Sequence, residues 1–415
     1  MKQTNEFQLV HKHIQSIMPK IECPAQDKIP HPYLMVAYGI AYGGTIFGWD
    51  HHHMAMRFAH AGQPRYLRHL ADNLLHFQHP DGFTPNCVHP VTGASLTPKF
   101  HAQPFLMQGA WMYAARTGDL EWLRRRFEQL KKYLSFYESC HAAPHGLFRW
   151  PLSWMSGFDN DVATSFFQQG TTIPADLSAW IYLEYRAASL LAAQLGQKRD
   201  SALYRKKAAA LRSAINRVLW NEKAQSYAAY NLCEGDSQFR LQDLNLDGEI
   251  GAYSFQTCSN LIPLYAGVTD EKKAKAMIKR YVWNEKHFLS PCGIRSLSKS
   301  SEYYNNAVWG NPPRFDDPSR LTNSNWQGPV WVPLNYFMFH ALRRYGFKNE
   351  ARDLAARTIH TLAGSLKKIG SFTENFHAET GEPLYAQKFA SWNILADIML
   401  EEMAPGKWIM DKLAG

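Results

Sequence analysis

Residues 120–137 read Leu-Glu-Trp-Leu-Arg-Arg-Arg-Phe-Glu-Gln-Leu-Lys-Lys-Tyr-Leu-Ser-Phe-Tyr, a stretch typical of an amphipathic helix. Its apolar residues recur at steps of three and four, which puts them on one stripe of a charged helix. Gly118 and Asp119 come directly before it, and they are expected to end the preceding helix and cap this one. Residues 104–117 are also helical in pattern, so the sequence predicts a helix pair joined by a tight turn.

The same arrangement recurs along the chain. Further pairs are predicted at 51–61 with 64–78, at 174–195 with 201–219 and at 329–345 with 349–369, before a last helix from about 388 to 403. Tight turns join one end of each pair, and long aromatic loops join the other end. Helix hairpins that repeat in this way stack so that each buries what it cannot bury alone.

If the array closes, the fold is all-α, an (α/α)6 barrel with a cleft at the rim of the long loops. An open α-solenoid is the alternative, but solenoid repeats have regular lengths and shared motifs, which these repeats do not have. We expect residues 1–415 to form a single barrel domain, with an irregular or hairpin insert at about 220–256.

The composition indicates a well-packed globular protein. Apolar residues make up 46% of the 415 residues, and the formal net charge is +9. Lys and Arg are spread over helix faces, so nucleic-acid binding is not expected. The six Cys form no CxxC pair, and no run of eighteen apolar residues predicts a membrane span. We expect a cytoplasmic protein, monomeric or homo-oligomeric, whose partner is a small sugar substrate.

The loop at Ser153–Val162 carries the first candidate chemistry. Asp159 and Asp161 follow Gly157 closely and lie beside Trp154 and Phe158. A carboxyl group against aromatic rings loses solvation, which raises its pKa and suits a general acid. An ordinary Asx-turn or helix cap is the competing interpretation of these carboxylates.

The other long loops contain the same residue types. They contribute Trp49-Asp50, Asp81-Gly-Phe83, Lys99-Phe-His-Ala-Gln103, Asn323-Ser-Asn-Trp326-Gln327 and Phe372-Thr-Glu374. Tryptophan faces stacked on sugar rings, with Asp, Asn and Gln bonding hydroxyls, are what a carbohydrate pocket needs. Asp50 is also expected to cap a helix that begins at His51.

Five motifs occur in a defined order: Trp49-Asp50, Gln103-Pro104, Ser-Gly-x-Asp-Asn at 156–160, Trp-x-Gly-Pro-x-Trp at 326–331 and Glu-Asn-x-x-x-x-Thr-Gly at 374–381. Together they resemble glycoside hydrolase family 63 and its trehalase relatives, in particular the small bacterial hydrolases of mannosylglycerate or glucosylglycerate. The resemblance implies an (α/α)6 barrel and an inverting mechanism that needs no cofactor. By motif position it makes Asp159 the general acid and Glu374 the general base.

The side chains expected to bind substrate come from the same loops: Tyr42, Trp49, Asp50, Phe83, Gln103, Trp326, Gln327, Trp331 and Gln387. The pattern leaves rival assignments open, with Asp161 in place of Asp159 and Glu379 or Glu382 in place of Glu374. Core packing is the competing interpretation of Trp326 and Trp331.

Two further clusters are possible ion or ligand sites. The consecutive His51, His52 and His53 point in different directions on a helix, so they make a poor metal site, and at most one is expected to reach the pocket. Asp243, Asn245 and Asp247 open like a calcium loop, but Ser254 stands where the twelfth position requires Glu. Structural calcium there is a secondary possibility beside a simple turn.

The function predicted first is an inverting α-glycosidase acting on a small α-glucoside or α-mannoside. A sugar epimerase or isomerase on the same barrel is the alternative, with His52, His101 and His377 available as proton shuttles. A non-catalytic carbohydrate-binding helical scaffold is the third hypothesis.

Overall fold

The computed structural model describes residues 4–166, 169–232, 256–311 and 324–414. Its helices are α1 (Asn5–Ile21), α2 (Gly48–His60), α3 (Arg65–Leu75), α4 (Leu106–Thr117), α5 (Leu120–Cys140), α6 (Val162–Ser165), α7 (Ala175–Gln194), α8 (Lys198–Ala214), α9 (Cys258–Ala266), α10 (Glu271–Met277), α11 (Val332–Arg344), α12 (Lys348–Ile369) and α13 (Asp411–Ala414). Short 3₁₀ helices are η1 (Ala41–Gly44), η2 (Pro144–Gly146), η3 (Ser153–Ser156), η7 (Ser391–Ile398) and η8 (Glu401–Met403), and two π-turns, η4 (Ile215–Leu219) and η6 (Ile278–Val282), extend α8 and α10.

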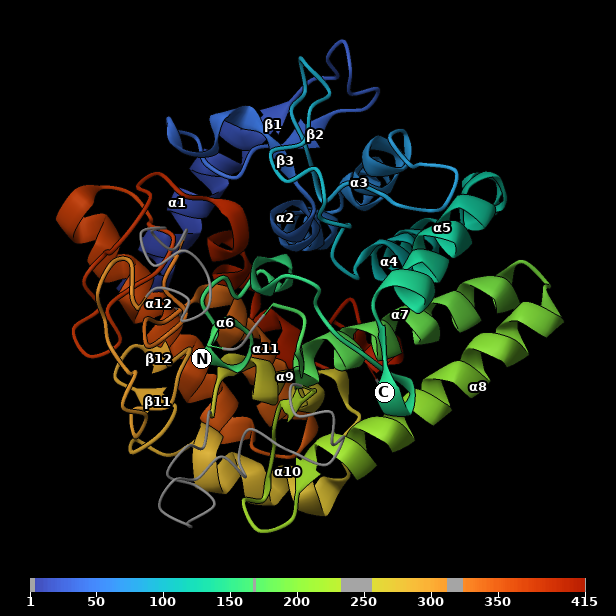
Figure 1. The fold of residues 1–415 in the computed structure, drawn as a ribbon. Helices are drawn as coiled ribbons and strands as arrows, with labels where there is room; N and C mark the ends of the chain where they lie inside the picture. The colour runs from blue at the N-terminus through green and yellow to red at the C-terminus, as the bar shows by residue number, and fades with distance from the viewer. Residues whose placement is uncertain (1–3, 167–168, 233–255, 312–323, 415) are drawn as a thin grey trace.

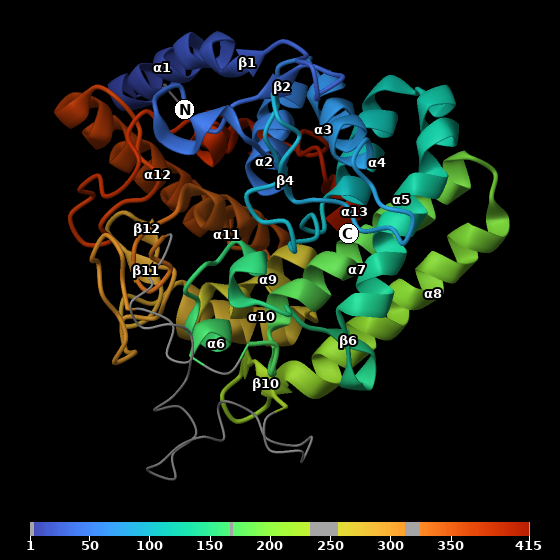
Figure 2. The same ribbon diagram turned by 45° about the horizontal axis from the view of Figure 1, so that its top comes forward.

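The helices pack in pairs, with α7 along α8 and α11 along α12 (Figures 1 and 2). The inner elements contact one another in the order α4, α7, α9, α11, η7 and α2, and α3 packs against both α2 and α4. The outer helices α3, α5, α8, α10, α12 and α1 cover the inner ones. Because the last inner element along the chain, η7, contacts the first, α2, the array is closed, and the predicted (α/α)6 barrel is confirmed in place of an open solenoid.

Helix α5 shows why these sequences form paired helices. Asp119 accepts a hydrogen bond from the Trp122 backbone N–H at 3.0 Å and caps the helix. Gly118 ends α4 in the left-handed conformation, which costs glycine nothing. The apolar stripe of α5 is buried as the spacing predicts, with Leu123, Phe127 and Leu130 at most 1% exposed.

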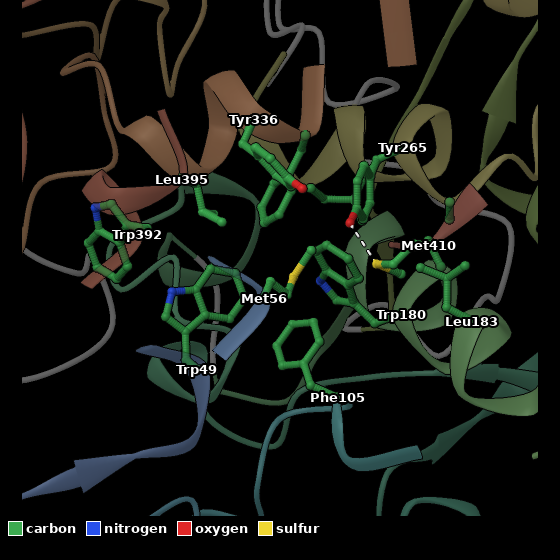
Figure 3. Packing of buried hydrophobic residues seen from close by; sticks show 14 of the residues in the cluster. Trp49, Met56, Phe105, Trp180, Leu183, Tyr265, Tyr336, Trp392, Leu395 and Met410 are labelled. Atoms are coloured by element: carbon green, nitrogen blue, oxygen red, sulfur yellow. Dashed lines mark hydrogen bonds between the residues drawn. The ribbon is translucent and has the colours of Figure 1, made fainter. Parts of the chain in front are cut away.

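Aromatic side chains fill the barrel axis (Figure 3). Trp49, Phe105, Trp180 and Phe337 come from the starts and middles of inner helices, and their rings lie 5.2–5.3 Å apart in the sequence Trp49–Phe105–Trp180–Phe337. Edge-to-face packing of this kind adds to the burial of apolar area. The axis is therefore a packed core.

The strands are two residues long and pair in antiparallel twos among those loops: β1 (Glu22–Cys23) with β2 (Tyr33–Leu34), β3 (Ile46–Phe47) with β4 (Cys87–Val88), β5 (Ala142–Ala143) with β6 (Leu147–Phe148), β7 (Thr172–Ile173) with β10 (Tyr230–Asn231), β8 (Trp220–Asn221) with β9 (Ser226–Tyr227) and β11 (Leu289–Ser290) with β12 (Gly293–Ile294). The expected insert at 220–256 begins as the hairpin β8–β9. The candidate calcium residues Asp243, Asn245 and Asp247 lie outside the described residues.

Two local predictions need correction. Helix α2 begins at Gly48, so Asp50 lies inside its first turn and is not its cap. The last helix expected at 388–403 is instead η7 and η8, because Lys388 and Ser391 take positive φ and the Ser391 N–H donates to the Val36 carbonyl. Among the described residues no helix is long and apolar enough to cross a bilayer, and the cytoplasmic location stays a prediction.

Candidate active site

A cavity of about 300 Å³ opens at the rim of the long loops, above the aromatic core. Its walls come from loops far apart in the sequence: Tyr42, Phe47, Trp49, Asp50, Asn86, Leu96, Thr97, Phe100, Gln103, Trp154, Gly157, Asp159, Ser324, Trp326, Trp331, Glu374 and Trp392. The closed barrel brings these loops together, because each one enters or leaves an inner helix at the same rim. Three carboxylates, Asp50, Asp159 and Glu374, share this one space.

Glu374 lies deep in the cavity and is 3% exposed. The Tyr42 hydroxyl donates a hydrogen bond of 2.6 Å to its Oε2. Burial raises the pKa of Glu374 well above its ordinary value, Tyr42 lowers it, and the negative charges of Asp50 and Asp159 raise it again. Tyr42 takes a left-handed backbone, φ 66°, which is uncommon for a tyrosine and brings its side chain to this carboxylate.

Asp50 lies in the first turn of α2 and is 9% exposed. The Ser391 hydroxyl donates to its Oδ1 at 2.6 Å, so the C-terminal η7 holds this carboxylate in place. Burial raises the pKa of Asp50 to about 7, and the charge of Asp159 adds to that rise. Near neutral pH, Asp50 therefore exchanges between an acceptor and a donor of hydrogen bonds to sugar hydroxyls.

Asp159 follows a tight bend between η3 and α6. Gly157 makes the bend with φ 82°, and a Cβ there would meet the Trp49 ring at 3.3 Å, so only glycine fits without a shift. The Ser324 hydroxyl donates to Asp159 Oδ2 at 2.6 Å. Asp159 is half-buried, so it faces the more open part of the cavity.

An amide network fixes the loop of Asp159 to the loop of Trp326. Asn160 accepts the Trp326 backbone N–H, and Gln327 donates from Nε2 to the Asn160 carbonyl at 2.9 Å. Gln327 also accepts from Asn311 through Oε1 at 2.9 Å. Gln327 is therefore held by hydrogen bonds through both amide atoms, is buried and is not among the residues that line the cavity, so its predicted contact with substrate stays a prediction.

The tryptophans serve both the core and the cavity. Trp326 and Trp331 stack on each other with ring centroids 4.0 Å apart and an 8° interplanar angle, and both are at most 1% exposed. The Trp331 Nε1 donates to the Asn325 carbonyl. Both tryptophans also line the cavity, so each one packs in the core and borders the pocket.

Eight of the eleven predicted site residues meet at the cavity: Tyr42, Trp49, Asp50, Gln103, Asp159, Trp326, Trp331 and Glu374. Besides Gln327, the structure does not bring Phe83 or Gln387 there. Phe83 packs on His101 and Phe136, with centroids 5.8 and 5.5 Å away, because its loop folds back over α5. Gln387 is exposed, in a segment where its neighbours Ala386 and Lys388 have positive φ.

Two lining residues carry buried polar atoms that have no partner within the described part of the chain. Trp49 presents Nε1–H as a donor, and Gln103 presents Oε1 as an acceptor while its Nε2 reaches the Met155 carbonyl at 3.4 Å. Buried polar groups normally find partners. A ligand rich in hydroxyls would satisfy both of these atoms.

The rival carboxylates have other partners. Asp161 caps α6, accepting from the Ala163 N–H at 3.1 Å and from Thr257 at 3.3 Å. Glu379 accepts from the buried Arg295 at 2.7 Å, and the exposed Glu382 pairs with Lys368. None of the three lines the cavity, so the geometry favours Asp159 and Glu374.

No histidine of the described chain lines the cavity. His51, His52 and His53 are each at most 2% exposed, and burial lowers the pKa of His51 to about 3 and of His53 to about 4, so these rings are neutral in the core. His101 is likewise buried and bonded to backbone groups of Thr84 and Tyr133. Within the described residues no group of three His, Cys, Asp or Glu is placed to hold a metal ion.

Several lining residues were missed in the sequence. Trp154, Ser324 and Phe100 lie inside loops that had been singled out, so their position was the available signal. Nothing in the sequence marked Ser391 and Trp392 as site residues, because they sit in a segment with the pattern of a helix. Only the closure of η7 onto α2 brings them to the site.

A closed helical barrel with three carboxylates in an aromatic cavity is the arrangement expected of a carbohydrate-active hydrolase. A profile of the mannosylglycerate hydrolase MGH1-like glycoside hydrolase domain matches residues 45–392, and the chain belongs to this family. It is a glycoside hydrolase, and the resemblance to family 63 and the trehalases is confirmed.

Solved structures share the fold at low sequence identity. The family 63 mannosylglycerate hydrolase of Thermus thermophilus, in complex with glucose, has a TM-score of 0.69 and 17% identity over 94% of this chain and 100% of that one. The same enzyme with Tris and D-glycerate gives 0.70 and 16% over the same shares. Neutral trehalase Nth1 from Saccharomyces cerevisiae gives 0.66 and 14% over 100% of this chain and 83% of that one.

Proposed function

We propose that this protein is an inverting α-glycosidase that hydrolyses a small α-glucoside or α-mannoside, such as glucosylglycerate, mannosylglycerate or a disaccharide. The observation that carries the proposal is the meeting of Asp159 and Glu374, from loops 215 positions apart in the sequence, at one aromatic cavity. The cavity volume of about 300 Å³ is at the small end of ligand pockets, which favours a short substrate over a polymer.

In this mechanism Asp159 protonates the glycosidic oxygen, and Glu374 removes a proton from the water that attacks the opposite face of the sugar. The attack inverts the anomeric centre, and no covalent sugar–enzyme intermediate forms. Asp50, Gln103 and Trp49 bind sugar hydroxyls beside the reacting carbon. Trp326 and Trp331 complete the wall of the sugar site.

The protonation states follow from the coupling of the carboxylates. Burial raises the pKa of Glu374, which works against the ionised form that a base needs. The charge of Asp159 is one cause of that rise, so a proton held by Asp159 lets Glu374 ionise, and the hydroxyl of Tyr42 stabilises the anion. We assign the proton to Asp159 because the inverting mechanism needs a protonated acid and an ionised base.

The rival functions find less support in the cavity. An epimerase needs proton shuttles at the pocket centre, and the candidates His52 and His101 are buried in the core instead. A binding scaffold has no need for several buried carboxylates whose charges oppose one another, an arrangement that costs stability.

Proton NMR of the purified protein with glucosylglycerate, mannosylglycerate, trehalose, kojibiose and nigerose tests the proposal. We expect cleavage of at least one compound, with the β-anomer released first. Initial release of the α-anomer would establish retention and overturn the roles of Asp159 and Glu374. Conversion to an isomer without cleavage would establish the epimerase instead.

A further inference from the structure

The proposed general base stands at the root of a hairpin. The chain from Glu374 to Tyr385 folds back on itself, and the Glu374 N–H donates to the Tyr385 carbonyl at 2.9 Å. Further along the hairpin, the His377 N–H donates to the Glu382 carbonyl, also at 2.9 Å. We call residues 377–382 the hairpin tip. Because backbone hydrogen bonds join the tip to the root, a contact that holds the tip also restrains the backbone of Glu374.

An ion pair holds this tip. Arg295, which follows β12 directly, donates from Nε and Nη2 to Oε1 of Glu379 at 3.0 and 2.7 Å. The Tyr304 hydroxyl donates to the same oxygen at 2.8 Å, and Lys299 Nζ lies 3.4 Å from Oε2. Arg295 is 1% exposed, whereas the side chain of Glu379 is 31% exposed. A buried guanidinium needs a paired anion, and the hairpin tip supplies it.

The guanidinium of Arg295 is itself fixed to the chain. Its Nη1 donates to the carbonyls of Glu285 and His287 at 3.2 Å each, and to the carbonyl of Leu289. These three carbonyls belong to the loop before β11 and to β11 itself. Arg295 is therefore a fixed attachment point for the tip, and not a side chain that follows the movement of the tip.

Backbone pairing joins the ion pair to the cavity wall. Arg295 forms an antiparallel bridge with Val330, and Val330 forms another with Phe376, two residues after Glu374. The Val330 N–H donates to the Phe376 carbonyl at 2.8 Å and its carbonyl accepts from the Phe376 N–H at 3.0 Å. Val330 directly precedes Trp331, which lines the cavity. The arginine, the hairpin of the base and one tryptophan of the wall are thus one connected unit.

A general base works only while it stays within hydrogen-bond distance of the water that it deprotonates, and small displacements lower the rate strongly. We infer that the ion pair of Arg295 and Glu379 positions the general base Glu374, so that its carboxylate keeps its contact with Tyr42 and with the attacking water. The inference rests on the proposed function. Glu379 does not line the cavity, so it acts through Glu374 and is a positioning residue.

Two substitutions in the hairpin tip test the inference. Glu379→Gln keeps the shape of the side chain and removes its charge. Glu382→Gln is the matched control, because Glu382 lies in the same tip but pairs with the exposed Lys368, a kind of ion pair that contributes little. On the panel compound that the wild type cleaves fastest, Glu379→Gln should lower kcat about tenfold with KM within twofold, and Glu382→Gln should stay within twofold in both. Glu379→Asp, which keeps the charge, should recover kcat to within about threefold of wild type.

α-Glucosyl and α-mannosyl fluoride identify the group through which the ion pair acts. Fluoride leaves without a proton, but the attacking water still needs the base, so the tenfold loss in Glu379→Gln should persist. The acid limb of kcat/KM should also move to higher pH, because a displaced Glu374 loses part of the Tyr42 hydrogen bond that lowers its pKa. Removal of a negative charge would by itself lower that pKa, so the expected direction cannot come from charge alone.

Several results would overturn the inference and leave the glycosidase intact: a kcat of Glu379→Gln within twofold of wild type, an equal loss in Glu382→Gln, or an acid limb that does not move to higher pH. A loss that disappears on the fluorides would also overturn it, because the ion pair would then act through Asp159. A loss as large as that of Glu374→Gln would make Glu379 the base itself.

Circular dichroism first establishes that each variant is folded at the assay temperature. If Glu379→Gln does not fold, Tyr304→Phe removes one donor to Glu379 without a change of charge. It should lower kcat about threefold on the panel compound and on the fluorides alike, and an unchanged kcat would overturn the inference. A wild type that cleaves neither the panel compounds nor the fluorides would overturn the proposed function, and the inference with it.

Discussion

Two sets of carboxylates in this barrel differ in the groups that they bind. Asp161, Asp176 and Glu184 form a framework set that accepts backbone N–H groups near helix starts: Ala163, Leu177, and both Met107 and Gln108. Asp50, Asp159 and Glu374 form a cavity set that accepts hydroxyl groups of Ser391, Ser324 and Tyr42.

Burial raises the pKa of members of both sets, to about 7 for Asp50, Asp176 and Glu184, to about 6 for Asp161 and well above the ordinary value for Glu374. A raised pKa alone therefore does not mark a catalytic carboxylate, although it is often used as such a marker. The two sets are distinguished by the groups that donate hydrogen bonds to each carboxylate and by whether the carboxylate lines the cavity. Substitutions in the two sets should separate activity from stability.

The largest effect is expected in the cavity set. Asp159→Asn and Glu374→Gln should each lower kcat on the natural type of substrate about 10³-fold, because each removes one proton-transfer group. Thermal unfolding should change little, since neither side chain supports a helix end. Asp161→Asn, two residues from the acid, is the matched control and should keep most of the activity.

An α-glycosyl fluoride separates the two roles, because fluoride leaves without a proton. Asp159→Asn should recover much of its activity on the fluoride, and Glu374→Gln should not. The reverse result would exchange the acid and the base.

Substitutions in the framework set should lower the free energy of unfolding. Glu184 on α7 accepts the N–H groups of Met107 and Gln108 at 3.1 and 3.0 Å, in the first turn of α4. Glu184→Ala leaves two buried donors unpaired and should lower the free energy of unfolding by about 1–3 kcal/mol, as measured in urea. The kcat of the fraction that stays folded should be close to wild type. A large loss of kcat without loss of stability would place Glu184 in the catalytic set.

Asp176 should make the free energy of unfolding depend on pH. Its pKa rises from 3.8 to about 7, so the folded protein holds this proton more tightly than the unfolded chain. Its contribution to the free energy of unfolding is then greatest below about pH 4 and falls as pH rises toward 7. Between pH 4.5 and 7.5, the free energy of unfolding of the wild type should fall by about 3 kcal/mol more than that of Asp176→Asn. Buried histidines change the free energy of unfolding in the opposite direction, but equally in the wild type and in Asp176→Asn. Parallel curves of the free energy of unfolding against pH for the two proteins would refute the prediction.

Tyr42→Phe should shift the pH profile of activity. The Tyr42 hydroxyl lowers the pKa of Glu374, so its loss raises the pH at which the base ionises. The acid limb of kcat/KM should move to higher pH, with about a tenfold loss near pH 6 and a smaller one near pH 8. A uniform loss at all pH values would mean that Tyr42 binds substrate and does not tune the base.

The smallest effects are expected at two glutamines, Gln103 and Gln387, which were both predicted to bind substrate. Gln103 lines the cavity, and Gln103→Ala should raise KM about three- to tenfold through the loss of one hydrogen bond. Gln387 is exposed outside it, and Gln387→Ala should change KM less than twofold. Equal effects at both positions would show that Gln387 reaches the substrate.

The sequence by itself determined the paired helices, the barrel and the loops that carry the site. The stripe of residues 120–137 and the turn at Gly118 are local signals, and ordered motifs such as Ser-Gly-x-Asp-Asn fix which loops matter. Asp159 and Glu374 were predicted from the positions of these motifs in the long loops, and both line the cavity.

Only the tertiary structure decided which neighbours of these residues face the cavity. Gln327 and Phe83 sit in the same loops as true lining residues, yet one turns into an amide network and the other packs over α5. Ser391 and Trp392 reach the site through a backbone bend bonded to Val36, more than 350 positions away in the sequence. The direction of a loop side chain depends on contacts between distant segments, and no local periodicity in the sequence encodes those contacts.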